Sequence, residues 1–143
     1  MSHFVVLPAR PPARMPESDL SLRRAPAIPR NPLQAVADAA ARHYKEQFGR
    51  GPVRCTAHFA GRDAVVVVLD GTMSPAERRL VLDGEDERVR SFRTLQQHGV
   101  QPTLCEVVAA LVGRPVVQAI TGIDVASDVA SEFFAFAPAA SER

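Results

Sequence analysis

The sequence predicts an α+β domain in which a four-stranded, mainly antiparallel sheet carries helices on one face. Two observations predict this class. A helix pattern followed by two strand patterns occurs twice along the chain, and a turn of only three residues joins the first two strands, which makes them antiparallel neighbours. The predicted order of elements is α-β-β-α-α-β-β. A chain of 143 residues has room for one such domain and a short appendage.

The chain divides into a leader, a domain and a tail. Residues 1–30 hold 6 of the 12 prolines, and their five arginines against two acidic residues leave a net charge of +3. Prolines cannot propagate a helix, and the few apolar side chains there do not offset the entropy of ordering. We therefore predict a disordered Pro/Arg-rich leader over residues 1–30, a single domain over residues 31–138 and a flexible tail over residues 139–143.

The first predicted element is a helix from Pro32 to Phe48. Asn31 is a typical capping residue, proline is favoured at the first helical position, and Gln34 follows the cap as in a capping box. Gly49 ends the helix in the usual left-handed position. Apolar residues at three- and four-residue spacing predict the face that packs on the sheet: Leu33, Val36, Ala37, Ala40, Tyr44 and Phe48.

Two strands follow, over Val53–Ala60 and Ala64–Asp70, with Gly61-Arg62-Asp63 as the turn. The first strand alternates between apolar and polar residues. The second is apolar on both faces from Val65 to Leu69, which is typical of a central strand that is covered twice. Since one layer of helices covers only one face, we expect the other face to meet a second copy of the chain in a homodimer.

The second half of the domain begins with Ser74-Pro75-Ala76-Glu77, a full capping box that predicts a short helix interrupted at Asp83-Gly84. A longer helix is expected from Glu85 to Gly113, kinked or split by Gly99 and Pro102. Strands over 116–121 and 132–137, around a 124–128 loop, complete the sheet. The apolar face of the long helix is expected to hold Val89, Phe92, Val100, Leu104, Val107, Val108 and Leu111.

Composition excludes several classes of function. Acidic and basic residues are mixed over residues 31–143 and nearly balance, whereas nucleic-acid binding needs clustered basic residues. The longest apolar run, Ala64–Leu69, is strand-sized, so no membrane insertion is expected. The start of the chain lacks the pattern of a secretory signal, which predicts a cytoplasmic protein whose Cys55 and Cys105 are buried and unpaired.

No catalytic, metal or cofactor constellation can be assembled from the sequence. Cys55, His58, His98 and Cys105 are the residue types that zinc prefers, but Cys55 and His58 lie an odd number of residues apart on a strand and leave opposite faces. No Gly-x-Ser-x-Gly or phosphate-binding glycine pattern occurs. The acidic run Asp83–Glu87 is read as a favourable helix start. The expectation is therefore a non-enzymatic protein without a cofactor.

Several of these turns and caps resemble the MpsC-like family. Residues 44–52, which end in Phe-Gly-Arg-Gly-Pro, resemble its Tyr/Phe-Gly-(Lys/Arg)-Gly-Pro signature, and residues 71–78 resemble its Gly-x-Leu-Thr-Pro-Ala-Glu element. Pro102-x-Leu104 and Leu111-x-Gly113-x-x-Val116 resemble two shorter stretches. The resemblance spans residues 31–138. The chain departs from the pattern at Gln101, where a basic residue is usual, and at Thr121-Gly122, where the family often has Ser-Asp.

The resemblance implies an accessory or regulatory protein linked to cation or bicarbonate transport and membrane potential. Its partner would be a membrane transport subunit, contacted through the two signature segments. The alternative is a small-ligand or anion-binding sensor that uses Arg50, with Arg54 and Thr72; an enzyme is a third and weaker reading. The candidate interaction surface consists of Gly49, Arg50, Gly51, Pro52, Thr72, Ser74, Pro75 and Glu77.

Overall fold

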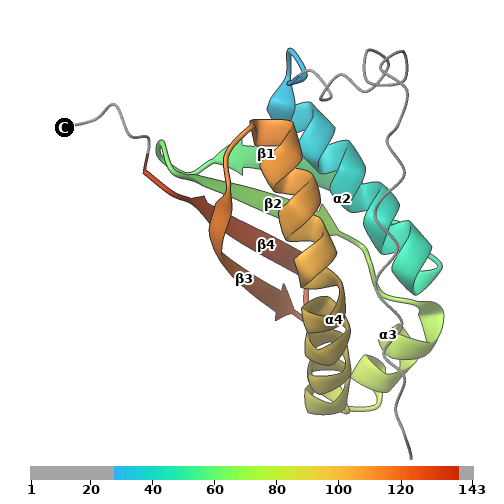
Figure 1. Ribbon diagram of the computed structural model, residues 1–143. Coiled ribbons are helices and arrows are strands. Elements are labelled where there is room, and N and C mark those ends of the chain that lie inside the picture. The colour runs from blue at the N-terminus through green and yellow to red at the C-terminus, as the bar shows by residue number, and fades with distance from the viewer. Residues whose placement is uncertain (1–27, 139–143) are drawn as a thin grey trace, which may run out of the picture.

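The computed structural model describes residues 28–138 (Figure 1). Over this range the chain forms the predicted order of helices and strands. The predictions for residues 1–27 of the leader and for the 139–143 tail concern residues outside this range. The elements are α2 (Pro32–Phe48), β1 (Arg54–Phe59), β2 (Ala64–Asp70), α3 (Pro75–Leu82), α4 (Asp86–Val112), β3 (Val116–Asp124) and β4 (Val129–Phe136).

The four strands form one antiparallel sheet in the order β1-β2-β4-β3. Each hairpin pairs its own two strands, and the two hairpins join where Val65 of β2 lies opposite Phe134 of β4. The apolar strand β2 is therefore central, as its sequence predicts. The α+β fold class and the antiparallel sheet are confirmed.

Both long helices cover the same face of the sheet (Figure 1). The buried stripe of α2, which includes Val36, Ala40 and Tyr44, packs with Val100, Leu104 and Val108 of α4 above β2 and β4. The sheet contributes alternate residues to this core, as a period of two requires. These are Val65, Val67, Leu69, Ala130, Phe134 and Phe136.

Helices α2 and α3 begin at the capping residues that the sequence predicts. The Asn31 side chain accepts a hydrogen bond from the Gln34 amide at 3.1 Å, and Gly49 ends α2 with a φ of 73°. At α3 the Ser74 hydroxyl accepts from the Glu77 amide at 3.2 Å, while the Glu77 carboxylate accepts from the Ser74 amide at 3.1 Å. These bonds occupy amides that a helix start leaves without a partner.

Helix α4 differs from its prediction in two ways. Pro102 lies inside one continuous helix of 27 residues, so the predicted split is wrong. Phe92, expected on the buried face, is 53% exposed, and the neighbouring Arg93 is 2% exposed in its place. The buried stripe consists of Val89, Arg93, Gln97, Val100, Leu104 and Val108. Within the described residues, α4 and the shorter helices lack the run of apolar residues needed to cross a membrane.

Candidate functional site

The two signature segments meet at one end of the sheet. The Gly49–Pro52 turn leads into β1, and the segment from Gly71 leaves β2 directly beside it, because the Val53 amide donates to the Asp70 carbonyl at 2.8 Å. At their crossing Gly71 adopts a φ of +70°, and a Cβ there would lie only 2.7 Å from Cγ2 of Val53. The contact leaves room for glycine alone.

Asp128, in the turn between β3 and β4, fixes the second segment. One carboxylate oxygen accepts hydrogen bonds from the amides of Thr72 and Met73, each at 3.1 Å, and the Asp128 carbonyl accepts from the Gly71 amide at 2.9 Å. The other carboxylate oxygen lies 3.5 Å from Nη2 of Arg78. Asp128 has a positive φ of 53°, which aspartate tolerates better than most residues. This turn therefore ties β2 and α3 to the far hairpin.

The buried guanidinium of Arg93 binds the same segment from the other side. Its Nε donates to Glu77 at 2.5 Å, and its Nη2 donates to the other Glu77 oxygen at 3.0 Å and to the Thr72 carbonyl at 2.5 Å. The guanidinium carbon also lies 5.5 Å from the ring centroid of Phe48, the last residue of α2 before Gly49. Arg93 thus joins α2, α3 and α4 around the two signature segments.

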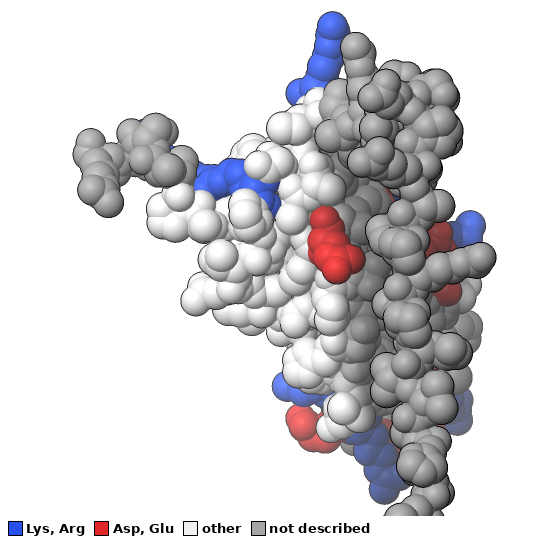
Figure 2. Space-filling view, viewed as in Figure 1, with Lys and Arg blue, Asp and Glu red and all other residues white. Residues whose placement is uncertain are grey.

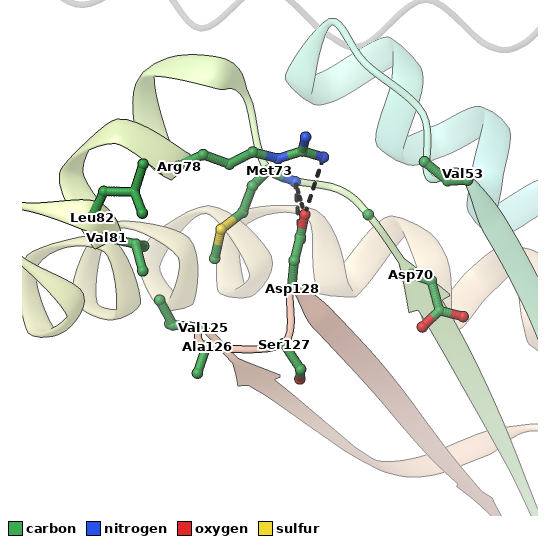
Figure 3. A pocket seen from close by; sticks show the side chains of 11 residues that line it. Val53, Asp70, Met73, Arg78, Val81, Leu82, Val125, Ala126, Ser127 and Asp128 are labelled. Atoms are coloured by element: carbon green, nitrogen blue, oxygen red, sulfur yellow. Dashed lines mark hydrogen bonds and ion pairs between the residues drawn. The ribbon is translucent and has the colours of Figure 1, made fainter.

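A cavity of about 580 Å³ opens beside this network, between α3 and the β3–β4 turn. We call it the α3 groove. Figure 3 shows Met73, Val81, Leu82 and Val125 on one side of Asp128, with Val53 and Asp70 on the other. The Arg78–Asp128 ion pair crosses it, and its volume lies in the range of sites that bind small molecules or short side-chain clusters.

Apolar side chains remain exposed around the α3 groove. Helix α3 has no buried residue, and Leu82 is 81% exposed. On the other side of α3 a second hollow of about 370 Å³ is lined by Leu80 and Phe92, which are 42% and 53% exposed. Figure 2 shows charged side chains gathered at this end of the molecule, while the middle of the same face is mostly uncharged. Exposed ion pairs contribute to this charge, for example the pair of Arg88 and Glu85 with a nitrogen–oxygen distance of 3.1 Å.

A second buried polar network lies under the two long helices. The Tyr44 hydroxyl donates to Glu132 at 2.6 Å and accepts from the Gln97 side-chain amide at 3.2 Å. Glu132 is fully buried, and its other oxygen has no hydrogen-bond partner among the described residues. Burial raises the pKa of the Glu132 carboxyl to about 7, opposed by the Tyr44 hydrogen bond. Burial and the nearby Glu132 charge also raise the pKa of Tyr44.

Comparison with protein-family models matches residues 32–138 to the family described as Na+-translocating membrane potential-generating system (MpsC). The chain belongs to the MpsC family. The matched range coincides with the residues from the first turn of α2 to just beyond β4. The family's description links this MpsC chain by name to a sodium-translocating system. Searches of curated proteins and of solved structures found no significant match.

The candidate surface of the MpsC chain gathers at one end of the molecule but is only partly solvent-facing. Gly49, Arg50 and Pro75 are exposed, and Gly51, Pro52, Ser74 and Glu77 are half-buried. Thr72 is 1% exposed. Most of its polar residues stabilise the fold itself. Ser74 and Glu77 form the capping box at the start of α3, and Glu77 also forms an ion pair with Arg93. The surface that remains available is the apolar one around the α3 groove.

The anion-binding trio of the alternative hypothesis does not share a solvent-facing space. The Thr72 side chain is buried, while Arg54 lies 3.8 Å from Asp70 across the β1–β2 pair. Arg50 alone stays in the exposed turn. The geometry of this MpsC chain therefore gives no support to an anion site built from these three residues.

Sequence reasoning missed Arg93 and Asp128, which organise the site. A signal for Arg93 existed: Val89, Arg93, Gln97 and Val100 follow one another at four- and three-residue spacing, so a cation and an amide lie in the apolar stripe of α4. For Asp128 the sequence showed only a loop aspartate, since its amide partners lie more than 50 residues away.

The cysteines and histidines lie as strand geometry predicts. Cys55 packs against the core, whereas His58 pairs with Val66 and is exposed on the other face of the sheet. Burial, with the nearby Asp38 charge, raises the pKa of the Cys55 thiol to about 11. Cys55 and Cys105 are unpaired and half-buried rather than buried. Residues 28–138 contain no group of three His, Cys, Asp or Glu side chains placed to hold a metal ion.

Proposed function

We propose that this MpsC chain is a non-enzymatic accessory subunit that binds an apolar segment of a membrane transport protein in the α3 groove, on the cytoplasmic side. The observation that carries the proposal is the exposed apolar surface of α3. A soluble surface rarely keeps a continuous apolar patch unless it meets a partner. Here Leu80 and Leu82 lie above two apolar hollows instead of in the core.

The underlying network supports a rigid platform. Asp128 and Arg93 hold the backbone of residues 71–73 from opposite sides, and the capping box holds the start of α3. A preorganised surface loses little conformational entropy on binding, so more of the contact energy contributes to affinity. The polar signature residues then act by shaping the apolar groove.

The residues that line the groove support an apolar occupant that carries one polar group. Apolar side chains of the partner would pack against Val53, Val81 and Leu82, which line the groove. The Arg78–Asp128 pair at 3.5 Å offers both a donor and acceptors to a polar group of the same segment. The family's description supplies the class of partner, a component of a sodium-translocating system that generates membrane potential.

Site-specific photo-cross-linking in the source cells tests this proposal. A photoreactive phenylalanine analogue at position 82 should form a covalent adduct with an integral membrane protein, identified by mass spectrometry. The matched control places the same analogue at Phe59, which is 50% exposed at the other end of the sheet, where β1 ends. The control should give at least tenfold less of that adduct.

Two outcomes contradict the proposal. One is an absence of adducts with any integral membrane protein from position 82, in cells where the chain is expressed and folded. The other is an equal yield of the same adduct from positions 82 and 59. A Leu82→Glu variant adds a second readout, because a buried carboxylate without a partner weakens an apolar contact strongly. Co-purification of the identified membrane protein should fall with it and stay unchanged with Phe59→Glu.

A further inference from the structure

The face of the sheet turned away from α2 and α4 is uncovered by any described element. Figure 1 shows both helices on the opposite face. The register defines the side chains that point away from the core, since they alternate with the buried positions Val65, Val67 and Leu69. We call this surface the open face. Its strand β2 is apolar there too, through Val66 and Val68.

The middle of the open face is mostly apolar. One cross-strand row consists of His58, Val66, Phe133 and Ile120, and Ile120 is 63% exposed. The next row consists of Thr56, Val68, Ser131 and Gly122, which are all small or β-branched. An uncovered, mostly apolar sheet face suits the packing of another sheet, at a spacing of about 10 Å.

Charges on the open face are confined to its last row, at the end where the β3–β4 turn lies. The row runs Arg54, Asp70, Val129 and Asp124 across the four strands. Arg54 lies on edge strand β1 and Asp124 on the other edge strand, β3. The row therefore has Arg54, which lies 3.8 Å from Asp70 of the same chain, at one edge of the sheet and the Asp124 carboxylate at the other.

We infer that the open face binds a second copy of this chain, through a two-fold axis parallel to the strands. Such a rotation keeps each row opposite the same row and exchanges the edges, so β1 of one copy lies over β3 of the other. Arg54 then faces Asp124 of the second copy, twice in the dimer. In the apolar row, Val66 faces Phe133 of the second copy.

The charges select this axis over its alternative. A two-fold axis perpendicular to the strands would invert the rows, so that Asp70 lies over Ala64 and Asp124 over Gln118 of the second copy. Asp124 would then meet only a neutral amide, and a hydrogen bond to a neutral donor is weaker than one to a guanidinium. The parallel axis instead pairs each edge cation with an edge anion.

The area of the open face indicates the expected affinity of the dimer. Four strands at ~4.8 Å spacing and about seven residues of ~3.3 Å each give a footprint of roughly 400 Å². This is about half the standard size of about 800 Å² per partner, in the range of weak and transient interfaces. We expect a reversible dimer whose population depends on concentration.

Sedimentation equilibrium of the full chain tests the interface. The unaltered chain should dimerise, and Ile120→Glu should weaken dimerisation at least tenfold. The matched control, Leu95→Glu, alters a residue that is 72% exposed on α4, away from the open face, and should leave the dimer unchanged. A chain that stays monomeric at all concentrations overturns the inference. So does a dimer that Ile120→Glu leaves intact.

Charge reversal tests the axis. Arg54→Asp and Asp124→Arg each place like charges opposite one another in a homodimer and should weaken it. Mixed in equal amounts, the two variants restore both opposite-charge pairs, so native mass spectrometry should detect mainly the heterodimer. Equal or weaker association in the mixture overturns the strand-parallel axis. Circular dichroism of each variant confirms that the monomer is folded, which matters because Asp124 accepts a turn hydrogen bond from the Ser127 amide at 3.3 Å.

Discussion

The two buried polar networks of this MpsC chain differ in whether the buried charge has a partner of opposite charge. Arg93 and Glu77 form an ion pair whose donors also satisfy the Thr72 carbonyl. Glu132 is buried beside Tyr44 and Gln97, which are neutral, and one of its oxygens has no hydrogen-bond partner in the described chain. A charge that has a partner stabilises the structure around it, whereas an isolated buried carboxylate favours its protonated form. Removing the Arg93 charge and removing the Glu132 charge should therefore have opposite consequences.

The largest effect is expected for Arg93→Leu. This variant leaves the Glu77 carboxylate and the Thr72 carbonyl without their partner in a mostly buried site, which should lower the free energy of unfolding by ~3–5 kcal/mol. Urea denaturation measures it. Arg90→Leu is the control on the same helix, since Arg90 is half-exposed and only 3.9 Å from Glu87. A loss for Arg93→Leu no larger than for Arg90→Leu would contradict the central role of the guanidinium.

Glu132→Gln should instead stabilise the protein at pH 8. Burial raises the pKa of Glu132 to about 7 in the folded protein, above its ordinary value, so the folded state binds this proton more tightly than the unfolded state does. The stability that it contributes is complete below about pH 4.5 and is lost as the pH rises through about 7. Glutamine removes this dependence, and the gain at pH 8 should be about 3 kcal/mol.

Thermal unfolding of the unaltered chain and of Glu132→Gln at pH 5 and pH 8 measures this difference. The melting temperatures should converge at pH 5 and separate at pH 8, with the variant higher. A variant that is less stable at pH 8 would show that the ionised carboxylate has a partner that stabilises it.

Tyr44→Phe should have a smaller effect, about 1 kcal/mol of destabilisation, because it removes the donor to Glu132 and one acceptor of Gln97. Gln97 keeps the Gly122 carbonyl at 3.4 Å. Since the Tyr44 hydrogen bond lowers the pKa of Glu132, the pH at which stability is lost should also rise. A midpoint that stays in place or falls would contradict the coupling between these two side chains.

The smallest effect is expected for Thr72→Val. The Thr72 side chain is buried, and its hydroxyl has no hydrogen-bond partner among the described residues, while the neighbouring backbone makes the contacts that matter. Replacing an unsatisfied hydroxyl by a methyl group of similar shape is nearly neutral or slightly stabilising. A change within about 0.5 kcal/mol in urea denaturation is expected. A loss of several times that amount would indicate a bound group at the hydroxyl.

Local rules explain which parts of this fold the sequence predicts. The bounds of α2 follow from a cap, a first-position proline and a left-handed glycine, all within the helix's own neighbourhood. The β1–β2 hairpin and the α3 capping box are equally local. The two-sided apolar pattern of β2 also predicts its central place.

The candidate site was less predictable because its organising residues act over long range. Arg93 replaces Phe92 in the core because Glu77, Thr72 and Phe48 provide a charge, a carbonyl and a ring at one point. The spacing of hydrophobic residues along a helix carries no information about partners that lie 16 to 45 residues away in the sequence. The two signature segments lie together at one end of the fold, where most of their polar side chains stabilise the structure.

The crossing of Gly71 with Val53 has a consequence for sequence variation in this family. A side chain at position 71 would need a φ near +70° and would meet Cγ2 of the Val53 side chain at 2.7 Å. Positions 53 and 71 are therefore expected to vary together, with any non-glycine residue at 71 accompanied by a smaller one at 53. Since both residues line the α3 groove, relatives that change this pair should also differ in the partners they accept.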